Sequence, residues 1–214
     1  MKPIARITGV LLLLTALLGA GSTAYAVEGA AKGSPRFTTT GTGDALVKIP
    51  KAYKPIIVSA THDGTANFIV KGLSRDGQKE SLLVNEIGPY SGTVLEDMGT
   101  FSGFTKKNPL VALEIKADGN WTVRTRPLAA APRDRQGTGM GDQVIKLRKP
   151  VKGLKKVAFT HNGTSNFIVK AVDRKGDTDL LVNEIGAYEG SGRIPPGTRY
   201  LSIKADGDWT YSIS

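Results

Sequence analysis

The sequence contains no cysteine among its 214 residues. Disulfides, thiol nucleophiles and thiolate metal sites are therefore excluded, and so is a lipid anchor, because lipoproteins are acylated on a cysteine. Only two histidines are present, which limits the side chains suited to acid–base catalysis. The fold must be stabilised by apolar burial and backbone pairing alone.

Long hydrophobic runs are scarce, and the one near the N-terminus has the form of an export signal. Lys2 and Arg6 precede an apolar stretch over residues 10–18, and Ala24-Tyr25-Ala26 is a small-x-small cleavage site. The stretch is shorter than the about 20 residues that a membrane span needs. We expect a signal peptide over residues 1–26, a secreted mature chain from Val27 that associates with the cell surface, and no transmembrane segment in it. A retained N-terminal anchor is the alternative.

Acidic side chains are outnumbered by basic ones, which gives a formal net charge of +10. Loss of Lys2 and Arg6 with the signal would leave +8, two less than the whole chain. Such a balance favours anionic partners such as envelope polymers, lipid headgroups or nucleic acid. Charge that serves solubility alone is the alternative.

Helical periodicity is also missing after the signal, whereas an internal repeat is prominent. Residues 61–71 return as 160–170, residues 82–88 as 180–186, and residues 116–119 as 204–207. Three matching blocks in one order indicate two copies of one folded unit. We expect a flexible leader over residues 27–36, a first repeat over 37–128, a linker over 129–135 and a second repeat over 136–214.

The repeats alternate apolar and polar residues with period two, which is typical of strands with one buried face. The clearest examples are residues 56–62, 110–116, 121–125 and 209–213. Turn pairs separate them, and we expect hairpin turns with positive φ at each: Asp63-Gly64, Asn162-Gly163, Asp76-Gly77, Lys175-Gly176, Asp118-Gly119 and Asp206-Gly207. The pattern predicts an all-β protein of two tandem antiparallel β-sandwich domains of jelly-roll type.

The first repeat is longer than the second by about ten residues, inserted within residues 95–107. Inserted loops often carry function, and Phe101 and Phe104 make this one apolar. One interpretation is that both rings fold back onto the domain. The other is an exposed binding loop, as in a secreted inhibitor of an extracellular protease.

The two histidines, His62 and His161, occupy equivalent positions at the ends of strands. As general bases beside a carboxylate they would serve a hydrolase, but no activating serine motif accompanies them. We favour a structural role in which each ring bonds loop backbone. The acidic residues match no calcium-loop spacing, and we expect neither a metal nor a cofactor.

Other recurring side chains are amides and aromatics. We expect Asn67, Asn166, Asn85 and Asn183 to pin neighbouring loops, or to form a polar shelf for sugar hydroxyls beside Tyr90 and Tyr188. Trp121 and Trp209 fall on the expected buried face, which favours a core role over sugar stacking.

The second repeat carries the densest group of cations. They are Lys146, Arg148, Lys149, Lys152, Lys155 and Lys156, against only Lys48, Lys51 and Lys54 in the matching part of the first repeat. No aromatic side chains are interleaved, so we expect no specific nucleic acid as partner. The segment suits salt-dependent contact with a polyanion.

The blocks at residues 61–70, 82–92 and 116–121, with their second copies, resemble repeat modules of exported actinobacterial proteins. The resemblance implies an exported, non-catalytic β-module and assigns no functional residue. We therefore expect a secreted binding or structural module that associates with an anionic cell-wall polymer or polysaccharide. A protein partner, as for the protease inhibitor, and a hydrolase that uses His62 or His161 are the alternatives.

Overall fold

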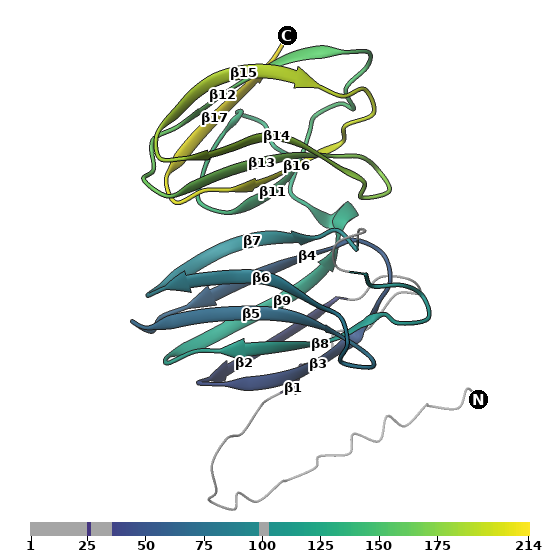
Figure 1. Ribbon diagram of the computed structural model, residues 1–214, viewed down its shortest axis with the longest axis vertical. Helices are drawn as coiled ribbons and strands as arrows, with labels where there is room; N and C mark the ends of the chain where they lie inside the picture. The colour runs from purple at the N-terminus through teal and green to yellow at the C-terminus, as the bar shows by residue number, and fades with distance from the viewer. Residues whose placement is uncertain (1–24, 27–35, 99–102) are drawn as a thin grey trace, which may run out of the picture.

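The structure is a computed structural model that describes residues 25–26, 36–98 and 103–214. Figure 1 shows two β-sandwiches stacked along the long axis of the molecule, one for each repeat. Within these residues, no helix is long and apolar enough to cross a membrane.

The first repeat consists of two antiparallel sheets. The β4 sheet has the order β1-β2-β9-β4-β7, and the β5 sheet has the order β3-β8-β5-β6. Their strands are β1 (Tyr25–Ala26), β2 (Phe37–Thr42), β3 (Ala45–Ala52), β4 (Ile56–His62), β5 (Asn67–Ser74), β6 (Glu80–Ile87), β7 (Tyr90–Glu96), β8 (Leu110–Lys116) and β9 (Asn120–Pro127). The short β1 pairs with β2 through residues that the expected signal cleavage would remove.

The second repeat follows the same plan. The β12 sheet has the order β10-β17-β12-β15, and the β13 sheet has the order β11-β16-β13-β14. Their strands are β10 (Thr138–Met140), β11 (Gln143–Lys146), β12 (Lys155–His161), β13 (Asn166–Val172), β14 (Thr178–Ile185), β15 (Tyr188–Ile194), β16 (Tyr200–Lys204) and β17 (Asp208–Ile213). Strands β2 to β9 correspond one by one to β10 to β17, and eight strands in this order form a jelly roll. The predicted fold class is confirmed.

Period-two alternation builds the core of each sandwich. In β4, Val58, Ala60 and His62 point inward, and their counterparts in β12 do the same. Trp121 and Trp209 are buried as expected, at 2% and 1% exposure. Each indole lies against a glycine of the neighbouring strand, where a Cβ would come within 2.3 Å of the ring.

The turn prediction is correct at two places and wrong at four. Gly77 and Gly176 have positive φ and connect strands paired within one sheet. The other four glycines lack positive φ, because their turns connect strands of opposite sheets. These four positions require glycine because there is no room for a side chain. A Cβ on Gly64 would lie 2.1 Å from Asp118, and one on Gly119 would lie 2.4 Å from the backbone of Gly64.

The two sandwiches share an apolar interface. Ile57 and Leu95, on the outer face of the β4 sheet, pack against the outer face of the β13 sheet. The partners there are Val144, Val172 and Tyr200, joined by Leu128 and Ala131 of the connecting segment, where the short η1 (Leu128–Ala130) lies. In Figure 1, β11 and β16 of the upper sandwich accordingly face β7 of the lower one.

Polar bonds flank this apolar interface and fix its register. The hydroxyl of Tyr90 donates to Oδ2 of Asp142 over 2.8 Å, and the backbone N–H of Thr93 donates to the carbonyl oxygen of Asp142. Nζ of Lys204 lies 2.9 Å from Oε1 of Glu86. Burial raises the pKa of Asp142, although the hydroxyl of Tyr90 partly opposes that effect.

The inserted loop does not present Phe104. Its ring is 5% exposed and belongs to the core of the first sandwich. For Phe104 the interpretation that the ring folds back onto the domain is confirmed, and the exposed binding loop is wrong. Phe101 lies outside the described residues. Leu95 and Glu96, at the start of the predicted loop, are still part of β7.

Candidate functional site

The three recurring blocks meet at one end of each sandwich, which we call the loop pole. In the first repeat Oδ2 of Asp118, between β8 and β9, accepts bonds from the backbone N–H groups of Thr65 and Ala66, each over 2.9 Å. In the second repeat Oδ2 of Asp206 does the same with Thr164 and Ser165. One carboxylate thus holds the loop that crosses from one sheet to the other.

The two histidines lie on the core side of the loop poles and contact the same aspartates. Nδ1 of His62 donates to the carbonyl oxygen of Gly88 over 2.9 Å, and its Nε2 lies 3.2 Å from Oδ1 of Asp118. The ring stacks on Phe68 with a centroid separation of 4.5 Å. His161 repeats these contacts with Gly186, Asp206 and Phe167. Both side chains are fully covered, so neither ring nitrogen can reach a substrate as the loops stand.

The same bonds favour the charged form of both carboxylates. The backbone N–H of Thr65, followed by that of Ala66, lowers the pKa of Asp118 below 3.8 against an opposing effect of desolvation. Burial alone would raise the pKa of Asp206, but bonds from Thr164 and Ser165 outweigh it and lower that pKa too.

A carboxyl whose pKa is lowered by folding stabilises the fold above its unfolded pKa and loses that contribution as the pH falls through the folded value. We therefore expect acid to weaken the poles below about pH 4. The double variant Asp118→Asn, Asp206→Asn should show a smaller drop in urea midpoint between neutral and acidic pH than the parent chain. The control is Asp179→Asn, an exposed residue of β14, which should retain the parental dependence of the urea midpoint on pH. Equal pH profiles for double variant and parent would contradict this role.

The four recurring amides do not pin loops, and that expectation is wrong. Asn67, Asn85, Asn166 and Asn183 are exposed, and their side chains form no hydrogen bond within the described part of the chain. Instead they alternate with isoleucine on the outer faces: Asn67 lies opposite Ile87, and Asn85 lies opposite Ile69. The aspartates of the poles hold the loops that we assigned to the amides.

The sugar shelf is not assembled either. Tyr90 packs its ring toward Phe68, at 5.8 Å between centroids, whereas Asn67 points to the opposite side of β5. Tyr188 has the same relation to Phe167. Gly92 and Gly190 leave room for these tyrosines, since a Cβ would come within 2.3 Å of either hydroxyl oxygen. Burial and Asp142 raise the pKa of Tyr90, which keeps its hydroxyl a donor.

The predicted basic segment divides into parts with different surroundings. Nζ of Lys146 lies 5.9 Å from the ring centre of Tyr200, near the interface between repeats, and Arg148 donates to the carbonyl oxygen of Arg135. Lys149 and Lys152 are exposed on the loop between β11 and β12, and Lys155 follows as the first residue of β12. None of these three lies within ion-pair distance of a described acidic side chain.

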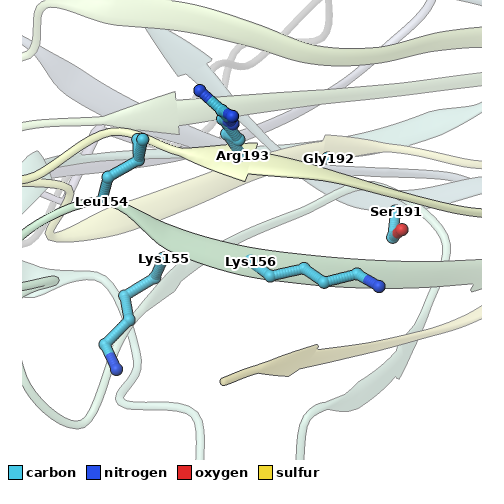
Figure 2. A pocket seen from close by; sticks show the side chains of 6 residues that line it. All are labelled: Leu154, Lys155, Lys156, Ser191, Gly192 and Arg193. Atoms are coloured by element: carbon cyan, nitrogen blue, oxygen red, sulfur yellow. The ribbon is translucent and has the colours of Figure 1, made fainter.

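A shallow cleft of about 480 Å³ lies beside Lys155 on the second repeat. Figure 2 shows the six residues that line it: Leu154, Lys155, Lys156, Ser191, Gly192 and Arg193. Three of them are cations and none is acidic. Lys156 and Arg193 come together because they are register partners on β12 and β15.

The comparisons with known proteins add no identity. No family model matches the chain, and a search of curated proteins finds none that is significantly similar. The chain comprises two all-β modules, each of two antiparallel sheets. The resemblance to exported actinobacterial modules remains an expectation.

Sequence reasoning missed Arg193 and Asp142. Arg193 is isolated in the sequence, and only the pairing of β12 with β15 brings it beside Lys156. Asp142 precedes a strand just as Asp44 does in the first repeat, but only Asp142 is buried, at 6% exposure. A repeat alignment that compared the charge of outward positions would have indicated Arg193, which replaces Leu95, but not Asp142, because Asp44 carries the same charge.

Proposed function

We propose that this protein is an exported, non-catalytic module that attaches to an anionic polymer of the cell envelope through its second repeat. The observation that carries the proposal is a group of exposed lysines that form no ion pair within the described residues, Lys149, Lys152 and Lys155. Exposed cations on one loop attract a polyanion without needing a shaped pocket, and salt screens that attraction within about 8 Å at physiological ionic strength.

The alternatives have less support. A hydrolase would need His62 or His161 at a surface, but both side chains are covered. An inhibitor would need the inserted loop to present its aromatic residues, but Phe104 belongs to the core.

The test is retention of the protein on purified cell walls at low and high salt. Replacing Lys149, Lys152 and Lys155 by glutamine should weaken retention at low salt about tenfold, equivalent to about 1.4 kcal/mol. The matched control replaces the exposed Lys51, Lys54 and Lys106 of the first repeat and should retain parental binding. Retention that ignores salt, or an equal loss in the control, would contradict the proposal.

A further inference from the structure

The interface between the two repeats joins two different faces. The first repeat contributes the outer face of its β4 sheet, and the second contributes the outer face of its β13 sheet. Because the repeats share one fold, each face has a counterpart on the other repeat. The β12 sheet of the second repeat and the β5 sheet of the first are these counterparts, and neither is covered by the described chain.

The polar residues that fix the intramolecular interface are preserved on the uncovered faces. The bond from Tyr90 to Asp142 has the counterparts Tyr188 and Asp44. The pair of Lys204 and Glu86 has the counterparts Lys116 and Glu184, which lie at the same strand positions of β8 and β14. Within the described residues these four side chains form neither that bond nor that ion pair.

The apolar centre has changed on both uncovered faces, and the changes are complementary. On the second repeat, Ile57 and Leu95 are replaced by the longer, charged Lys156 and Arg193. On the first repeat, the bulky Tyr200 is replaced by Ala112, which leaves room for longer side chains.

The charge of the uncovered β5 face also differs from that of its covered counterpart, in a way that complements Lys156 and Arg193. Ser202, which lies beside Val144 on the outer face of the β13 sheet, is replaced on the β5 sheet by the exposed Glu114. Beside Glu114 lies Leu46, the counterpart of Val144, at 65% exposure. Lys48 is on this face too, opposite Ala112, so it has no equivalent of the Tyr200 ring that lies beside its counterpart Lys146.

We propose that the uncovered β12 face of one chain docks on the uncovered β5 face of a second copy, in the geometry that joins the two repeats within a chain. Lys156 and Arg193 then meet Glu114, Tyr188 donates to Asp44, and Lys116 pairs with Glu184. Such a head-to-tail contact uses two different faces, so every added chain presents a free face again. The expected product is an open row of sandwiches along the long axis in Figure 1.

The contact between chains should be weaker than the one within a chain. Leu128 and Ala131 of the connecting segment add apolar contacts to the intramolecular interface, and the described residues of a second copy contribute no equivalent of them. Within a chain the linker also holds each repeat at a high effective concentration near the other. Association is therefore expected to depend on protein concentration and, because charges face each other at its centre, on salt.

The test is sedimentation velocity of the mature chain over a range of concentrations at low and high salt. Glu114→Lys and Arg193→Glu should each raise the dissociation constant about tenfold, and the double variant should recover at least part of that loss, because the two charges are exchanged. Asp179→Lys makes the same charge change as Glu114→Lys on exposed β14 and should associate like the parent.

The outcomes separate this inference from the proposed envelope binding. A chain that stays monomeric at all concentrations, or single variants that associate like the parent, would overturn the stacking. So would a double variant weaker than both singles. Glu114→Lys should still bind cell walls, whereas replacement of Lys149, Lys152 and Lys155 should leave self-association intact. If Arg193→Glu lost wall binding while the parent stayed monomeric, the occupant of this face would be a polyanion and not a second copy.

Discussion

Replacing Gly163 by alanine is expected to destabilise the second repeat by about 3 kcal/mol, the upper end for overpacking a close contact. A Cβ at this position would lie 2.0 Å from Oδ1 of Asp206 and 2.5 Å from Nε2 of His161. Neither neighbour can retreat easily, because Asp206 holds the crossing loop and His161 is stacked on Phe167. The substitution must therefore break either the loop pole or the packing below it.

The measurement is urea unfolding of the variant and the parent, with the loss seen as a lower midpoint at an unchanged slope. Gly192→Ala is the matched control, since a Cβ on Gly192 would have no atom within 4 Å and the φ of this residue is not positive. It should be neutral or slightly stabilising, because alanine restricts the unfolded chain more than glycine does. Equal midpoints for the two variants would show that the pole relaxes freely and that these glycines are not required by space.

The turn glycines also show how far the sequence could be interpreted. Asp-Gly and Asn-Gly pairs are good turn signals, and Gly77 and Gly176 behave as that rule predicts. The rule failed at Gly64 and Gly163, because it assumes that the flanking strands pair with each other. Their strands belong to opposite sheets, and that fact depends on long-range pairing that local pattern does not contain.

The candidate site could likewise be predicted only where it depends on neighbouring residues. Alternation placed His62 and Trp121 on the buried face correctly, because period two needs only neighbouring residues. The role of Asp118 was missed, since it acts on a loop more than fifty residues away in the sequence. For Phe104 the sequence left a buried and an exposed position open, because composition tells how apolar a loop is and not whether the core has room for it.

The residues at the interface between repeats give the second large expected effect. Ile57→Lys combined with Leu95→Arg would give the first repeat the pair that the second repeat carries at Lys156 and Arg193. Ile57 is 0% exposed and packs in the shared cluster with Val144 and Tyr200. Two unpaired cations there would cost several kcal/mol each if they stayed buried.

The double variant should therefore open the interface instead of burying its charges, so that the repeats unfold in separate transitions and the radius of gyration of the native protein increases. Urea unfolding and small-angle scattering measure the two effects. The reciprocal change, Lys156→Ile with Arg193→Leu, is the control at dilute concentration and should leave the intramolecular interface closed. One unchanged transition with a parental radius would contradict the role of Ile57 and Leu95. The expected contrast follows from one pair of equivalent positions, which carries Ile57 and Leu95 where the second sandwich covers it and Lys156 and Arg193 where the described chain leaves it open.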